Sequence, residues 1–250
     1  MELKEQNNEF MIDCLLLAGR IMIESGAETY RVEDTMLRMA VSQNMLDAQC
    51  YATPTGIIFS LGKTQPTRIT SISRRNTDLQ KISLVNSVSR RLTSQIITLE
   101  EAYDELKSIQ KTNYFLPNYV QVLAAALASG CFLILFNGIW SDIPVTILAG
   151  GLGFATLLLM NYLTKVKFFT EFTAALIIGL VAHVSVNYGY GEQIDKIIIS
   201  SVMPLVPGIL ITNAVRDLMA GHLMSGLSKG AEGFLTAFAI GAGIAVSLSF

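Results

Sequence analysis

Five long apolar segments in the C-terminal half restrict what this 250-residue chain can fold into. A helix needs about twenty mostly apolar residues to cross the roughly 30 Å hydrocarbon core of a bilayer. The five segments predict an all-α membrane bundle of about five transmembrane helices, because the bilayer core offers no hydrogen-bond partners to unpaired backbone groups. The segments that meet the length requirement are 119–138, 143–163, 172–190, 197–215 and 230–249.

Charged residues are concentrated before these segments. Residues 1–115 hold 27 of the 38 charged side chains, and residues 116–250 hold the other 11. The first density is close to that of soluble domains, in which about a quarter of residues are charged. We therefore expect a soluble domain over 1–115 and a transmembrane domain over 116–250. A net charge of −2 provides no basic stripe for a phosphate backbone, which excludes nucleic-acid binding.

The soluble domain is expected to be α+β. Apolar residues at three- and four-residue spacing predict a helix that ends at Ser25–Gly26, a second that begins near Glu28–Thr29, and a third over 77–94. The pattern Thr98-x-x-Glu101 is a capping box and predicts the start of a fourth helix.

A hairpin is predicted between the second and third helices. Segments 49–61 and 67–73 are rich in β-branched and aromatic residues, and they flank the turn sequence GKTQP at 62–66. We therefore expect two strands here.

Charge placement predicts the orientation of the chain. The start, MELKEQNNEF, lacks the basic and apolar regions of a secretory signal, so residues 1–115 are expected in the cytoplasm. Lys165 and Lys167 then lie in one cytoplasmic loop, and Arg216 and Lys229 lie in a second. This agrees with the positive-inside rule and places Phe250 outside. We expect a multi-pass protein of the cytoplasmic (inner) membrane.

Small residues recur every four positions along the last span, at Gly233, Ala237, Gly241 and Ala245. Such a stripe lets membrane helices approach closely. It predicts tight packing, either within the chain or against another chain, and it makes a homo-oligomer one possible assembly.

The fourth span contains the most informative sequence. Pro204 and Pro207 each remove a backbone donor, and Gly208 loosens the chain, so this span is expected to be broken about halfway. Broken helices in transporters present a positively polarised N-terminus to anionic groups of a substrate. Pro207 and Gly208 are therefore candidate substrate-binding positions.

Polar residues follow this break, at Thr212, Asn213, Arg216 and Asp217. Spacings of three and four place the hydroxyl, the amide and the guanidinium on one helix face, where they could bind a small carboxylate-bearing solute. In the alternative interpretation, Arg216 reaches the lipid headgroups at the cytosolic end of the span and Asp217 caps the next turn.

Other ionisable residues lie within or beside the spans. Asp217, His183 and His222 are candidates for proton coupling, since imidazole titrates near neutral pH. His183 could instead be a neutral side chain hydrogen-bonded within the bundle. Lys229 and Glu232 are three residues apart and are expected to pair.

Enzymatic chemistry has no signature here. Cys14, Cys50 and Cys131 are widely spaced without a CxxC, so neither a disulfide framework nor a metal site is indicated. An intramembrane enzyme would need a nucleophile, an acid pair or a metal site, but the sequence has no GxSxG, no paired intramembrane aspartates and no HExxH. No cofactor is expected.

Two stretches carry a family resemblance. PGILITNAVRDLMAGHLMSG, at 207–226, and ESGAETYRVEDTMLRMA, at 24–40, resemble the threonine/serine exporter family, in particular its YjjP-like large subunits. The resemblance covers nearly the whole chain. The positions that match the first motif are Pro207, Gly208, Thr212, Asn213, Arg216 and Asp217, whereas His222 stands where an acidic residue is usual.

The resemblance implies a cytosolic head followed by five spans, and a separate small multi-span subunit (YjjB-like) as partner. It also implies export of threonine and serine, or of organic acids such as succinate. We expect a subunit of a secondary transporter that is driven by the proton gradient and works in the lipid bilayer. The alternative is a membrane scaffold or sensor whose cytosolic head binds a partner.

Overall fold

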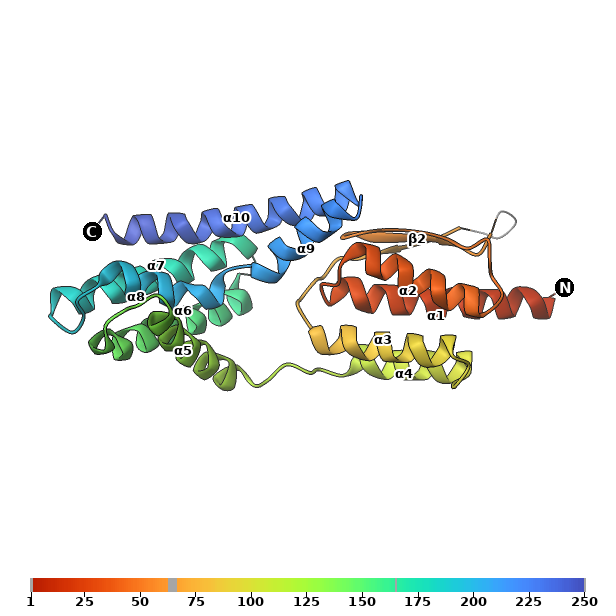
Figure 1. Ribbon diagram of the computed structural model, residues 1–250, viewed down its shortest axis with the longest axis horizontal. Helices are drawn as coiled ribbons and strands as arrows, with labels where there is room; N and C mark the ends of the chain where they lie inside the picture. The colour runs from red at the N-terminus through yellow and green to blue at the C-terminus, as the bar shows by residue number, and fades with distance from the viewer. Residues whose placement is uncertain (1, 63–66, 165, 250) are drawn as a thin grey trace. The chain divides into compact units, whose positions relative to one another are not determined.

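The computed structural model describes residues 2–62, 67–164 and 166–249, and the chain forms two compact units (Figure 1). We call Met1–Phe115 together with Ile209–Gly230 the head unit. We call Leu116–Gly208 together with Ala231–Phe250 the bundle unit. The predicted turn at 62–66 lies outside the described residues except for Gly62, as do Lys165 and Phe250, on which part of the orientation prediction rests.

The head unit has three layers in its N-terminal part. A three-stranded antiparallel sheet covers one side of the α1–α2 pair, and the α3–α4 pair covers the other (Figure 1). The predicted helices are confirmed as to existence and type. The elements are α1 (Glu2–Glu24), α2 (Thr29–Ser42), β1 (Gln49–Thr53), β2 (Gly56–Ser60), β3 (Arg68–Ser71), α3 (Leu79–Thr93) and α4 (Leu99–Lys111).

Local sequence signals explain how these helices begin and end. The chain turns away from α1 at Gly26, two residues after the helix ends. Gly26 has a φ of +84°, which glycine adopts without a steric cost. The capping box of α4 is present: the Thr98 hydroxyl accepts from the Glu101 N–H at 3.2 Å, and the Glu101 carboxylate accepts from the Thr98 N–H at 2.8 Å. Each bond satisfies a donor that the helix leaves open.

The sheet corrects the hairpin prediction. The predicted strand 49–61 is two strands, β1 and β2, which pair with each other through a tight turn at Pro54–Thr55. Proline fixes φ and favours the first central position of a turn. The Thr53 hydroxyl further closes the turn, because it accepts from the Gly56 N–H at 3.1 Å. The sheet order is β1-β2-β3, and β2 pairs antiparallel with β3. The predicted hairpin is therefore present as β2–β3, and β1 extends it to a three-stranded meander.

The bundle unit is built of apolar helices. Among the described residues, four helices are long and apolar enough to cross a membrane, and the bent pair α8–α9 would make a fifth span. The α9 residues from Ile209 on and the first turns of α10, to Gly230, belong to the head unit. The elements are α5 (Asn118–Leu135), η1 (Trp140–Asp142), α6 (Ile143–Leu163), α7 (Lys167–Asn187), α8 (Ile194–Val202), η2 (Met203–Leu205), α9 (Gly208–Met219) and α10 (Leu223–Ser247).

The predicted break in the fourth span is present. The helix tightens to a 3-10 turn over Met203–Leu205, stops at Val206–Pro207, and resumes as α9 at Gly208. Pro207 cannot donate a backbone hydrogen bond, so helical pairing cannot run through this point. The start of the fifth span was predicted too late. The helix α10 begins at Leu223, seven residues before the predicted start at 230.

A buried aspartate fixes a loop of the bundle unit. Asp142 has no exposed surface, and its carboxylate accepts from the backbone N–H groups of Glu192, at 2.8 Å, and Gln193, at 2.9 Å. These two residues directly precede α8, whose N-terminal donors need acceptors. Asp142 thereby ties the start of α6 to the start of α8.

Small residues bring the bundle helices together. Gly150 on α6 faces Ser129 on α5, and Gly179 on α7 faces Ser247 on α10. On α10 the buried positions include Gly243, whereas Ala237, Gly241 and Ala245 of the predicted stripe are exposed. Most of that stripe therefore does not pack against the described residues of its own unit.

We expect Gly243→Ala to destabilise the protein. A Cβ on Gly243 would meet the carbonyl oxygen of Phe172 and the backbone nitrogen of Leu176, at 3.0 Å, on α7. Helix backbone cannot rotate away, so the two helices would have to separate, at a cost of about 1–3 kcal/mol. Thermal unfolding of the full-length protein in detergent measures the effect.

Gly241→Ala is the matched control on the same helix. In the part of the chain that the structure describes, no atom lies within 4 Å of a Cβ at Gly241. Measured on the monomeric chain without a partner subunit, this variant should unfold at the same temperature as the wild type. Equal losses for the two alanine variants would contradict the assignment of Gly243 to the helix contact.

Candidate functional site

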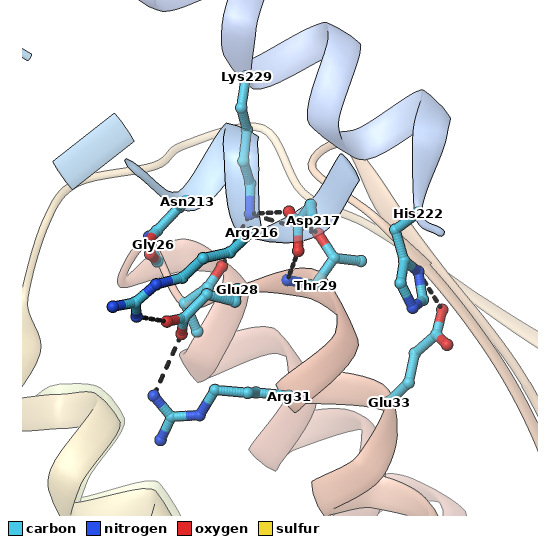
Figure 2. Close-up of polar contacts among 11 residues, drawn as sticks. Gly26, Glu28, Thr29, Arg31, Glu33, Asn213, Arg216, Asp217, His222 and Lys229 are labelled. Atoms are coloured by element: carbon cyan, nitrogen blue, oxygen red, sulfur yellow. Dashed lines mark hydrogen bonds and ion pairs between the residues drawn. The ribbon is translucent and has the colours of Figure 1, made fainter. Parts of the chain in front are cut away.

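The polar residues that follow the break lie against the loop that joins α1 to α2 (Figure 2). Asn213, Arg216 and Asp217 come from α9, and Lys229 comes from the first turns of α10. Their partners lie within Gly26–Thr29, the end of that loop and the start of α2. All of these residues belong to the head unit.

Asp217 is the buried centre of the site. Its side chain has no exposed surface, and one oxygen accepts from the Thr29 N–H at 2.9 Å. The other oxygen accepts from the Thr29 hydroxyl at 3.0 Å and from the Lys229 ammonium at 2.8 Å. Because Glu28 at the N-cap makes no side-chain cap bond among the described residues, Asp217 supplies the acceptor that the start of α2 needs.

Lys229 connects the carboxylate to the loop backbone. Its side chain is 7% exposed, and besides Asp217 it donates to the carbonyl oxygen of Ala27 at 2.9 Å. A buried ammonium requires both a counter-ion and hydrogen-bond acceptors, and this position provides them. The predicted pairing of Lys229 with Glu232 is wrong: Lys229 pairs with Asp217, and Glu232 pairs with Lys167 of the bundle unit.

Asn213 fixes the glycine of the same loop. Its side-chain amide is buried and donates to the carbonyl oxygen of Gly26 at 2.8 Å. With Lys229 on Ala27 and Asp217 on Thr29, the backbone of the loop is held at three of four successive residues.

Glu28 lies between two arginines. One carboxylate oxygen accepts from Arg216 at 2.6 Å, and the other accepts from Arg31 at 3.1 Å. Burial opposes ionisation of Glu28, but hydrogen bonds from its own backbone N–H and from both arginines outweigh it, so its pKa lies below the ordinary 4.5. The Glu28 side chain is therefore an anion at neutral pH.

His222 makes a looser polar contact within the head unit. Its Nδ1 lies 3.7 Å from a carboxylate oxygen of Glu33 on α2, and both side chains are partly buried. The same Glu33 oxygen accepts from the Ala52 N–H at 2.8 Å, which fixes it against β1.

The predicted site residues are thus only partly brought together. Asn213, Arg216, Asp217 and His222 all contact the α1–α2 loop or α2. Thr212 is exposed on α9, and Pro207 and Gly208 form the break. His183 belongs to the bundle unit, where its Nε2 lies 2.8 Å from the amide nitrogen of Asn187 on its own helix. This arrangement matches the hydrogen-bonded alternative for His183.

Sequence reasoning missed the partners of these residues. Glu28, Thr29 and Lys229 complete the network, although no local pattern links 28–29 to 216–229. One signal was available: Glu28 and Thr29 lie inside ESGAETYRVEDTMLRMA, the second stretch of the family resemblance.

Among the described residues, no group of three or more His, Cys, Asp or Glu side chains could hold a metal ion. Burial raises the pKa of Cys14 and of Cys50 to about 12, so neither thiol is a nucleophile at neutral pH.

We expect Lys229→Met to destabilise the protein strongly. The substitution keeps the volume but leaves the Asp217 carboxylate buried without its cation, which costs about 3–5 kcal/mol. Replacing both partners, as Lys229→Met with Asp217→Asn, should recover much of the loss. Thermal unfolding of the full-length protein measures both effects.

Lys167→Met is the control, since the Lys167 side chain is half exposed in its pair with Glu232. Partly exposed pairs contribute about 0–1 kcal/mol, so this variant should unfold close to the wild-type temperature. Equal losses for the two methionine variants would show that burial of the Asp217–Lys229 pair has no special energetic role.

Three relatives cover most of the chain. It is 22% identical over 242 residues to "Probable threonine/serine exporter" of Mycobacterium tuberculosis, with 95% of this chain and 46% of that protein aligned. It is 24% identical over 234 residues to "Probable succinate transporter subunit YjjP" of Klebsiella aerogenes, with 91% and 89% aligned. The Escherichia coli K12 protein of the same name is 24% identical over 239 residues, with 92% and 91% aligned.

The chain therefore spans about half the length of the mycobacterial relative and nearly all of the two YjjP proteins. No solved structure matches it. The threonine/serine exporter family, ThrE, matches residues 13–250. With its apolar helices, this match makes the chain a multi-pass membrane protein with a transport rather than an enzymatic role. The chain belongs to the threonine/serine exporter family.

Proposed function

We propose that the chain is one subunit of a secondary transporter that exports small amino acids, such as threonine and serine, or small organic acids, such as succinate. The proposal extends the family match and the names of the relatives to this chain. The observation that carries it is the guanidinium of Arg216, which is 56% exposed beside an otherwise buried network.

Arg216 is suited to a carboxylate ligand. Its planar fork has five N–H donors, and one nitrogen, Nη1, contacts Glu28. Two parallel bonds from such a fork match the two oxygens of a carboxylate. Thr212, one turn earlier on α9 and exposed, would extend this binding face. Pro207 and Gly208 at the break remain proposed substrate-binding positions.

The proposed orientation is a cytosolic head, an external C-terminus and residence in the inner membrane. It is supported by the position of Arg216 and Lys229 within the head unit, because both are basic residues of one predicted cytoplasmic loop. The substrate would then meet Arg216 from the cytoplasm, as export requires.

Proton coupling is proposed at three positions. A proton on Asp217 would remove the charge that holds Lys229, and a proton on His222 would strengthen its contact with Glu33. His183 is the third candidate, in the last part of the apolar helix α7.

A separate multi-span subunit is the proposed partner. The YjjP relatives are named as subunits, and the mycobacterial relative is about twice as long as the matched region. The exposed face Ala237–Gly241–Ala245 of α10 fits a closely packed helix from that partner or from a second copy.

Arg216→Lys tests the binding role. Lysine keeps the charge, so an anchoring role at the headgroups would survive the substitution. A binding role would lose one charge-assisted hydrogen bond, worth roughly 1.5–3 kcal/mol, and the half-saturating concentration would rise about tenfold or more. The measurement is transport of labelled threonine and succinate in proteoliposomes against substrate concentration.

Arg38→Lys is the matched control, because Arg38 forms an exposed pair with Asp34 on α2, outside the site. Its curve should overlay the wild type. If the Arg216→Lys curve overlays it too, Arg216 does not bind the substrate. If wild-type vesicles transport no member of a small-acid panel, the scaffold alternative gains support.

Cysteine labelling tests the orientation. In a Cys131→Ala background, which removes the exposed native thiol, Ser249→Cys should react with an impermeant maleimide on intact cells. Leu46→Cys, at an exposed position of the head unit, should react only after lysis. The reverse pattern would overturn the proposed topology.

A further inference from the structure

The Glu28 carboxylate lies where a substrate carboxylate would bind Arg216. Figure 2 shows it between the guanidinium groups of Arg216 and Arg31. Its oxygens lie 2.6 Å from a nitrogen of Arg216 and 3.1 Å from a nitrogen of Arg31. The Glu28 side chain is 7% exposed, whereas those of Arg216 and Arg31 are 56% and 40% exposed. The buried carboxylate of Glu28 thus pairs with two arginines that are also exposed to solvent.

The two ion pairs at the site differ in strength. Asp217 and Lys229 are both buried, and separating them would leave two charges without solvent or a counter-ion. In the Glu28–Arg216 pair only Glu28 is buried, and Arg216 already has 56% of its side chain in contact with solvent. Separating this pair leaves one buried charge rather than two, and that charge still has Arg31 as a partner. A ligand can therefore displace the second pair without disturbing the first.

The loop backbone cannot follow Glu28 when it leaves. The loop is held at the carbonyl oxygens of Gly26 and Ala27 and at the N–H of Thr29. The movable part is the Glu28 side chain, and Arg31, three residues later on the first turn of α2, already contacts its second oxygen. Rotation of this side chain alone could release Arg216 while Arg31 keeps the carboxylate neutralised.

We propose that Glu28 is an internal competitor for the substrate: it occupies Arg216 in the empty site and moves onto Arg31 when a substrate carboxylate binds. The inference rests on the proposed binding role of Arg216. Glu28 and Arg31 then set the affinity for carboxylates without contacting the substrate.

This exchange predicts that two substitutions three residues apart have opposite effects on substrate affinity. Glu28→Gln removes the competing charge, so substrate should bind about two- to fivefold more tightly, the factor that corresponds to a partly exposed pair. Arg31→Gln removes the alternative partner of Glu28, so Arg216 is held more firmly and substrate should bind about two- to fivefold more weakly. A merely structural role would weaken binding in both variants.

The test uses the full-length chain, purified from membranes with any subunit that accompanies it. Half-saturating concentrations for succinate and threonine are measured in proteoliposomes. Modification of Arg216 by phenylglyoxal, quantified by mass spectrometry, provides a readout that does not need transport. It should be faster in Glu28→Gln and slower in Arg31→Gln, and 1,4-dicarboxylate should protect Arg216 in the wild type.

Asp34→Asn and Arg38→Gln are the matched controls, because they make the same changes of charge in an exposed pair on the same helix. Both should leave the two readouts unchanged. Opposite shifts for Glu28→Gln and Arg31→Gln support the exchange, and shifts in one direction, or none, overturn it.

Arg216→Lys separates the two proposals. If it impairs transport while the Glu28 and Arg31 variants shift together, only the exchange is wrong. If it leaves transport unchanged, the binding role of Arg216 fails and the exchange fails with it.

Discussion

The buried contact between Asp217 and Lys229 is the interaction on which the rest of the site depends. The two charges come from α9 and α10, twelve residues apart, and they meet the start of α2 almost two hundred residues away in sequence. A pair without solvent must satisfy all of its hydrogen-bonding groups internally. Thr29 and the Ala27 carbonyl oxygen do so, which makes the α1–α2 loop part of the same structure as α9.

That constraint explains why the remaining polar side chains are where they are. Asn213, one turn before Asp217, reaches the Gly26 carbonyl oxygen, and Arg216, adjacent to Asp217, projects to Glu28. The carboxylate of Asp217 thus serves as the helix cap that α2 lacks, and the arginine beside it retains a surface for ligands. The Asp217–Lys229 pair and the Glu28–Arg216 pair are therefore neighbours. The first is expected to be rigid and the second exchangeable, because only the second has a solvent-exposed partner.

The fold also explains how a motif can serve two purposes. Thr212, Asn213 and Arg216 were predicted to form one polar face for a substrate, yet Asn213 is buried against the loop, as is the neighbouring Asp217. Arg216 is the site residue whose neighbours are buried and whose guanidinium is exposed. The proposed binding role is therefore limited to Arg216 and to the exposed Thr212, one turn earlier on α9. The charge of Glu28 then becomes part of the energetics of binding rather than of stability alone.

Local patterns in the sequence were sufficient for much of the fold. The apolar segments, the capping box at Thr98–Glu101 and the break at Pro207 depend on hydropathy, on neighbouring side chains and on a missing N–H, all of which are local. The turn at Pro54–Thr55 was also local, but it was read as the interior of one strand because the flanking residues all favour strands.

The ion pairs were decided by the tertiary structure. Lys229 has Glu232 one turn away, yet it pairs with Asp217, because the choice between two carboxylates depends on which one shares its buried space. The same holds for Glu28, whose partner Arg216 lies 188 residues away and is invisible to any pattern of spacing. Sequence by itself determined which segments are helical, apolar or broken, since those properties follow from neighbours along the chain. Which charges meet was settled only by folding, because the energy of a buried charge depends on everything packed around it.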